Sequence, residues 1–139
     1  MMIKIQKKEF NIEKEIKIIK DQYSSIGAVN TFVGYVRDIN NNRDVKFLDL
    51  EVYKEMAIKE LSKIKDNAVD KWSLIDCLII HRYGRLHINE KIVLVACFSE
   101  HRNDSFEGCK FIMDYLKKDA PFWKKEFYNE ESSWLQNTS

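Results

Sequence analysis

The amino-acid sequence predicts an α+β fold with a largely antiparallel sheet. Its 139 residues match the usual size of one domain, and 45% hydrophobic with 32% charged residues is an ordinary balance for a folded protein. Segments with helical spacing are mixed with strand-like segments, without a steady strand–helix–strand order. One proline and four glycines leave no linker that would divide the chain. We therefore expect residues 1–139 to form a single domain.

The first half of the chain predicts three strands, one helix and a polar loop. Ile3 and Ile5 alternate with polar residues, which is typical of a short strand. Apolar residues at helical spacing follow over residues 12–23, with Asn11 placed to cap the helix. Residues 27–36 and 48–52 have the β-branched or alternating character of strands. Residues 38–44 are rich in Asn and Asp, which favour turns, so we expect a loop there.

The middle of the chain predicts a second helix and two apolar strands. An apolar stripe indicates a helix over residues 54–71. Apolar runs predict strands over residues 74–81 and 92–99. We expect residues 83–91 to form the turn between them, with Asn89 in a left-handed conformation.

A third helix and an aromatic tail complete the chain. Asp104 and Glu107 have the spacing of a capping box before the helix, and Pro121 should end it near residues 117–119. Residues 122–127 form a short aromatic and basic tail, and we expect Trp134 to be a last packed point. The inner face of the helix should carry Phe106, Cys109, Ile112, Met113 and Leu116.

Composition and motifs argue against several functional classes. A net charge of +1 argues against a mainly electrostatic DNA-binding protein. The longest apolar run, residues 92–98, is far short of the ~20 residues that span a bilayer, and the N-terminal segment lacks a signal-peptide core, so we expect a cytoplasmic protein. Three cysteines without common zinc spacing predict neither a disulfide framework nor a metal site. The motifs GxGxxG, GxxxxGK, HExxH and GxSxG are missing.

A set of cations at the ends of predicted elements is the best candidate for chemistry. Arg37 ends a strand, His101 and Arg102 follow another, and Lys117 and Lys124 flank the Pro121 break. Arginine offers a fork for phosphate, and two neighbouring lysines would lower each other's pKa, so that one could act as a base. On spacing alone, an ordinary solvent-facing role for these cations stays open and is the commoner one. A second His–Arg pair, His81 and Arg82, begins the predicted turn and is expected only to brace it.

The ordered set of segments resembles the catalytic (large) subunit of molybdopterin synthase. The matching stretches are GAVNTFVGYVRD, LEVYKEMAIKEL, IIHRYGRL and SEHRNDSFEGCKFIMDYLKKDAPFWKKE, followed by Trp134. The resemblance implies an α/β hammerhead fold and a homodimer, with a small ubiquitin-like sulfur-carrier subunit at each end to give a heterotetramer. The carrier's C-terminal Gly-Gly thiocarboxylate would supply two sulfurs to cyclic pyranopterin monophosphate, giving the dithiolene of molybdopterin. It implies no metal and no cofactor at this step, no nucleic acid and no membrane.

The resemblance also implies roles for individual residues. Lys117 and Lys124 match the family's catalytic lysines, and Lys117 is expected to matter most. Residues around them match substrate-binding positions, partly across the dimer interface: Tyr35, Val36, Arg37, His101, Arg102, Lys125 and Glu126.

The chain departs from the family pattern at two places. Asn40, Asn41 and Asn42 stand where many relatives have a glycine in the loop, and Ser133 stands where an arginine often precedes the late tryptophan. Two other readings stay open: a non-enzymatic anion- or RNA-binding module, and an inactive scaffold for the carrier, against which the retention of both lysines argues.

Overall fold

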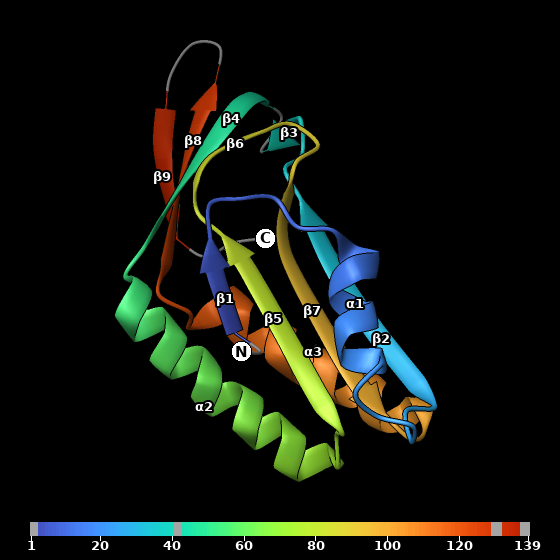
Figure 1. Cartoon of the computed structure of the whole chain (residues 1–139). Helices are drawn as coiled ribbons and strands as arrows, with labels where there is room; N and C mark the ends of the chain where they lie inside the picture. The colour runs from blue at the N-terminus through green and yellow to red at the C-terminus, as the bar shows by residue number, and fades with distance from the viewer. Residues whose placement is uncertain (1–2, 41–42, 129–131, 137–139) are drawn as a thin grey trace.

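The computed structural model describes residues 3–40, 43–128 and 132–136, with the backbone alone for 39, 40, 43 and 132–136. Three helices lie within this part of the chain, as the sequence predicts (Figure 1). They are α1 (Ile12–Lys20), α2 (Lys54–Trp72) and α3 (Arg102–Lys118). Among the described helices none is long and apolar enough to cross a membrane.

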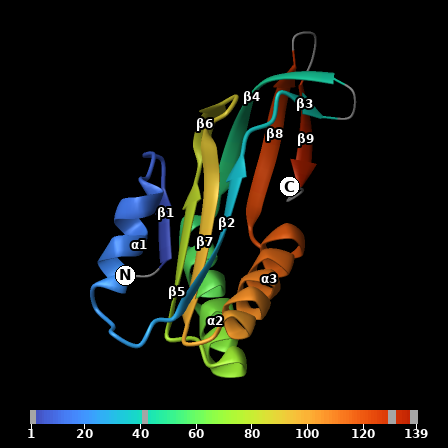
Figure 2. The ribbon, with the colours of Figure 1, turned by 90° about the vertical axis from the view of Figure 1, so that its right-hand side faces the viewer.

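A four-stranded sheet forms the centre of the molecule. Its strands are β1 (Ile3–Gln6), β5 (Asp76–Arg82), β7 (Lys91–Ser99) and β2 (Ala28–Tyr35), in that spatial order. β1 runs parallel to β5, whereas β5·β7 and β7·β2 are antiparallel. Figure 2 shows α1 on one face of this sheet and both longer helices on the other. The prediction of a mainly antiparallel α+β fold is confirmed.

The two faces of the sheet bury different side chains because successive residues of a strand point to opposite sides. On β5, Leu78 and Ile80 pack with Phe10 and Ile19 on the α1 side. Cys77, Ile79 and their neighbours face α2 and α3 and join the larger core. The two-sided burial explains why β5 and β7 read as continuous apolar runs. It also places His81, two residues after Ile79, on the side of the larger core.

A second sheet stands beyond the end of the first. β4 (Arg43–Val52) pairs with β3 (Ile39–Asn40), β6 (Gly84–His87) and β8 (Phe122–Tyr128), and β8 pairs with β9 (Ser132–Gln136). Two loop predictions were therefore wrong. Residues 83–91 contain β6, and residues 38–44 contain β3 and the start of β4. Both predictions followed local turn residues, whereas pairing with a strand distant in sequence decided the structure.

Helix α3 begins one turn earlier than the capping-box prediction. His101 is its N-cap and makes no side-chain cap hydrogen bond, so Asp104 and Glu107 lie inside the helix. Phe106 is 56% exposed, contrary to the expected inner face. Small residues such as Gly108 face inward instead. The space there is too narrow for a side chain, since a Cβ on Gly108 would lie only 2.9 Å from Leu74 Cδ1.

Several local predictions are confirmed. Asn11 caps α1, its side chain accepting a hydrogen bond from the Lys14 N–H at 3.0 Å. Asn89 has a φ of 72°, and α3 ends at Lys118, before Pro121. Asn41 and Asn42 lie outside the described residues, as do the side chains of Asn40 and Trp134.

Candidate active site

Strand β8 divides its basic residues between two faces. Phe122 and Glu126 are buried and Lys124 is half-buried, and these three share one face because they alternate along the strand. Trp123 and Lys125 belong to the other face, where the Lys125 Nζ lies 5.2 Å from the Phe127 ring centroid. The adjacent lysines of FWKKE therefore have different environments.

The inner face of β8 continues the apolar face of β4, its neighbour in the sheet. The antiparallel register places Leu50 opposite Lys124 and Leu48 opposite Glu126. Leu50 is 1% exposed and Glu126 is 4% exposed. Lys124 thus has a buried leucine as its cross-strand neighbour and a buried carboxylate two residues along the same face.

The pKa of Lys124 is lowered from its usual value. Burial is the largest cause, because a low-polarity environment disfavours the ammonium form, and the charge of Arg37 acts in the same direction. Glu126 opposes both by stabilising the charged form. Arg37 lies two residues beyond the end of β2 at Tyr35. The residue between them, Val36, is buried and fixes the chain to the core at this point. Arg37, Lys124 and Glu126, all three predicted from the sequence, are brought together.

His81 is a member of this cluster that the sequence analysis did not assign to it. Its imidazole stacks on Phe122, with ring centroids 3.8 Å apart and an interplanar angle of 19°. Burial is the main cause that lowers the pKa of His81 to about 4, and the charge of Lys124 adds to it. An isolated His–Arg pair at a predicted turn gave no local signal for this placement.

Lys117 lies in the last turn of α3 and is exposed. Three residues, 119–121, connect that helix to β8. The short connection keeps Lys117 at the base of the strand that carries Lys124. The Lys117 stem is not packed in the single chain, which leaves its amine available to a ligand or to a second protein surface.

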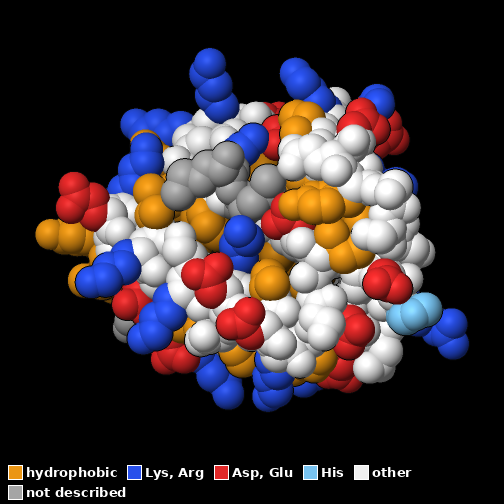
Figure 3. All heavy atoms as spheres, turned by 60° about the horizontal axis from the view of Figure 1, so that its bottom comes forward, with side chains coloured by type: hydrophobic (Ala, Val, Ile, Leu, Met, Phe, Trp, Pro, Cys, Tyr) orange, Lys and Arg blue, Asp and Glu red, His pale blue; other side chains and the backbone are white. Residues whose placement is uncertain are grey.

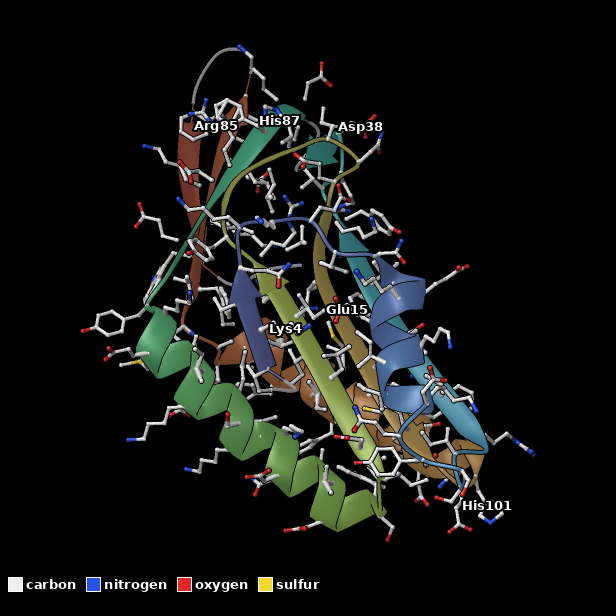
Figure 4. The ribbon with its side chains drawn as sticks, viewed as in Figure 1. Lys4, Glu15, Asp38, Arg85, His87 and His101 are labelled. Carbon is white, nitrogen blue, oxygen red and sulfur yellow. The ribbon has the colours of Figure 1, made fainter. Side chains whose placement is uncertain are left out.

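His101 and Arg102 lie at the other end of α3. A helix of 17 residues is about 25 Å long at 1.5 Å per residue, so the two cations are far from Lys117 within one chain. Figure 4 shows His101 at the end of the molecule opposite Arg85 and His87. Both residues are exposed and line an open hollow with Gly27, Glu100 and Phe106.

The face at the lower end of the molecule does not present a field of one charge (Figure 3). Figure 3 shows acidic and basic side chains interspersed over the face formed by the lower end of the molecule. Within the described part of the chain, no group of three or more His, Cys, Asp or Glu residues is placed to hold a metal ion. Cys77, Cys97 and Cys109 are buried thiols, with 3.8 Å between Cys77 Sγ and Cys97 Sγ.

The remaining predicted positions contribute differently. Tyr35 is 49% exposed at the end of β2, whereas the Val36 side chain lies in the core. Ser133 pairs with Glu126 through the β8–β9 ladder, although its side chain lies outside the described set. The backbone of β9 therefore runs directly beside the segment that carries Lys124.

Comparison with known proteins gives a consistent result. A family model described as MoaE protein matches residues 5–119. The chain is 46% identical over 133 residues to the molybdopterin synthase catalytic subunit of Ralstonia nicotianae, covering 96% of this chain and 76% of that protein. It is similar to the molybdopterin biosynthesis MoaE protein of Burkholderia ambifaria, with a TM-score of 0.86, 41% identity, and coverage of 99% of this chain and 90% of that one. A molybdopterin synthase structure from Staphylococcus aureus superposes with a TM-score of 0.90 at 30% identity, covering 97% of both chains.

Proposed function

The chain belongs to the MoaE protein family, and from this premise we propose that it transfers sulfur to cyclic pyranopterin monophosphate to form the dithiolene of molybdopterin. The relatives named molybdopterin synthase catalytic subunit support the activity. The observation that carries the proposal is the half-buried Lys124, whose pKa is lowered by burial and by Arg37 on a face shared with Glu126. We further propose that residues 1–139 act as one domain, in the cytoplasm.

The cluster has the chemistry that the reaction requires. Arg37 supplies a planar fork for a phosphate, and an amine with a lowered pKa exchanges protons near neutral pH more readily than an ordinary lysine. Lys124 would move protons while the phosphate ring opens and the carbon–sulfur bonds form. A bound phosphate would raise the pKa of Lys124 again, because a nearby negative charge favours the ammonium form. Substrate binding and proton transfer are thereby linked at one side chain.

A second copy of the chain would complete the site. His101 and Arg102 lie about 23 Å from Lys117 along α3, at 1.5 Å per residue, yet the family resemblance gives them substrate-binding roles. A two-fold dimer resolves this difference if the N-terminal end of α3 in one protomer lies beside β8 of its partner. We therefore propose a homodimer in which the two ends of α3 serve different active sites.

The sulfur donor is proposed to be a small ubiquitin-like carrier with a C-terminal Gly-Gly thiocarboxylate, bound at each end of the dimer to give a heterotetramer. An extended Gly-Gly tail fits a narrow approach because it has no side chains. The exposed Lys117 amine lies where such a tail could be bound between α3 and β8. We propose that side chains of the chain itself carry out binding, orientation and proton transfer at this step.

The decisive experiment mixes the purified chain with thiocarboxylated carrier and cyclic pyranopterin monophosphate and measures molybdopterin. We expect product with the intact carrier and none with a carrier that lacks its Gly-Gly tail. Equal turnover with the truncated carrier would contradict the donor assignment. Salt-sensitive RNA binding without any molybdopterin formation would favour the non-enzymatic anion-binding alternative.

The role of Lys117 can be tested separately. Lys117→Ala should remove most activity and leave the fold intact, because the side chain is exposed and contributes little to the core. Lys117→Arg keeps the charge and holds its proton too tightly for exchange, so it should retain substrate binding without turnover. Turnover of Lys117→Arg near the wild-type rate would show that Lys117 supplies only positive charge.

A further inference from the structure

His81 is a buried polar residue that the proposed reaction has not yet used. It is 8% exposed, near the end of β5, and its strand neighbours are Ile5 of β1 and Val93 of β7. Its ring stacks on Phe122 with 3.8 Å between the ring centroids. Phe122 precedes Lys124 by two residues on the same face of β8, a separation of about 7 Å along a strand. The charge of Lys124 acts on the imidazole, so the two side chains lie near each other.

One hydrogen bond determines which ring nitrogen carries the proton. The Nδ1 atom of His81 lies 2.8 Å from the backbone carbonyl oxygen of Arg82. A carbonyl only accepts, so Nδ1 must donate and therefore carries the hydrogen. In a neutral imidazole the lone pair then belongs to Nε2, the ring nitrogen farther from the β5 backbone. His81 thus has a fixed tautomer and a fixed ring plane.

We propose that His81 is a positioning residue for Lys124, which it holds by offering the Nε2 lone pair to the lysine amine from the Phe122 side. The stack on Phe122 fixes the plane of the imidazole, and the Arg82 carbonyl fixes its rotation. An acceptor held in this way restricts where the Lys124 Nζ lies and stabilises its ammonium form against burial. The effect on turnover rests on the proposed function, whereas the placement does not.

The charges around His81 are consistent with a neutral imidazole. Lys124 faces it from β8, with Glu126 farther along that strand and Arg37 beyond the end of β2. Ile5 and Val93 flank it within the sheet. Burial and the Lys124 charge both lower the pKa of His81, so the lone pair remains available at neutral pH. A protonated His81 would instead repel Lys124 and add a third cation to the cluster.

Two amide substitutions distinguish the contributions of the two ring nitrogens of His81. His81→Asn places an amide near Nδ1 and keeps a donor for the Arg82 carbonyl, but it has no group at Nε2. His81→Gln reaches toward Nε2 and keeps an acceptor there. His87→Gln, at an exposed residue of β6, is the matched control. The purified full-length chain carrying lysine labelled with ¹³C and ¹⁵N at its side-chain end is titrated by NMR, with Lys124 assigned from Lys124→Arg.

The proposal expects the pKa of Lys124 to fall in His81→Asn, because the ammonium loses an acceptor, and to return toward wild type in His81→Gln. In the sulfur-transfer assay, kcat of His81→Asn should fall about 10-fold or more, since a misplaced group slows the chemical step. Its KM should be nearly unchanged. His81→Gln should recover part of the lost kcat. An unchanged Lys124 pKa in both variants would overturn the proposal. Equal losses of kcat in both variants, matched to equal losses of thermal stability, would also overturn it. The NMR titration needs no turnover, so a change in Lys124 pKa without any sulfur transfer would uphold the placement and reject the proposed function.

Discussion

The dipeptide His–Arg occurs twice in this chain, and its two copies have opposite environments. His81 and Arg82 end β5 and are 8% and 6% exposed. His101 and Arg102 begin α3 and are exposed beside an open hollow. A residue type therefore does not determine a role. The buried pair fixes neighbouring groups, whereas the exposed pair is available to a ligand or to a second protomer.

The largest difference in activity between two variants is expected at Lys124, which lies beside the buried pair, when it is compared with Lys125. Lys124→Ala should lower kcat by ~10²–10⁴-fold, which is the usual range for loss of a group that transfers protons. Lys125→Ala, on the opposite face of β8, is the control and should lose much less. Steady-state sulfur transfer with unchanged circular dichroism measures the effect. Equal losses at both lysines would show that the two faces of β8 are not functionally distinct.

A mixing experiment tests whether the exposed pair acts across a dimer. His101→Ala and Lys124→Ala should each be nearly inactive as separate homodimers. If each active site takes His101 from one protomer and Lys124 from its partner, random exchange makes about half the dimers mixed, each with one intact site, so about a quarter of wild-type activity returns. Exchange is confirmed by native mass spectrometry. Mixed dimers without recovered activity would place both residues in one protomer's site, and an active His101→Ala homodimer would remove His101 from the site altogether.

The two arginines should differ in their effect on stability. Arg82 donates to the carbonyl oxygens of Lys7 and Lys91 and lies 3.4 Å from a Glu90 carboxylate oxygen. Arg82→Met leaves these acceptors unpaired, so we expect a loss of about 2–5 kcal/mol in the free energy of unfolding. Arg102→Met should change it by no more than about 0.5 kcal/mol. Urea titration of both variants makes the measurement, and similar values would contradict the distinction.

The buried histidine should couple the stability of the fold to pH. The pKa of His81 falls from 6.5 to about 4 on folding, chiefly through burial. Between these values the unfolded chain binds the extra proton, so stability is present above pH 6.5 and is lost as the pH falls toward 4. The contribution is about 3 kcal/mol. Unfolding measured from pH 7 to 4 should show a shallower loss of stability in His81→Gln than in wild type. A wild-type slope in His81→Gln would show that His81 is not a source of the pH dependence.

The sequence predicts elements well where their residues respond to local rules. Helix α1 follows from its spacing and the Asn11 cap, and β5 and β7 from uninterrupted apolar runs. Strand β6 could not be found this way, because Gly84 and Asn89 mark turns and its four residues become a strand only by pairing with β4. The prediction that Phe106 lies on the inner face of α3 was wrong for a different reason. The buried Ser105 and Gly108 let α3 approach Leu74, in the connection between α2 and β5, and the helical phase then directs the large side chain outward.

The candidate site divides in the same way. The family resemblance predicted Arg37, Lys124 and Glu126, and the structure brings them together. Neither resemblance nor spacing placed His81 there, because its partner Phe122 is 41 positions away and the contact is made only by the folded chain. The alternation along FWKKE could have separated Lys124 from Lys125, but only once residues 122–128 were recognised as a strand.

The parallel pairing of β1 with β5 has a consequence for the order of folding. Ile3 pairs with Ile79, so β1 leaves the ribosome 76 residues before its partner. At a synthesis rate of about 5–20 residues per second, β1 waits roughly 4–15 seconds before that partner is even made. The antiparallel neighbours β5 and β7 are closer in sequence and can associate soon after synthesis. The central sheet is therefore expected to grow outward from its middle, with β1 added late as an edge strand although it is synthesised before its neighbours.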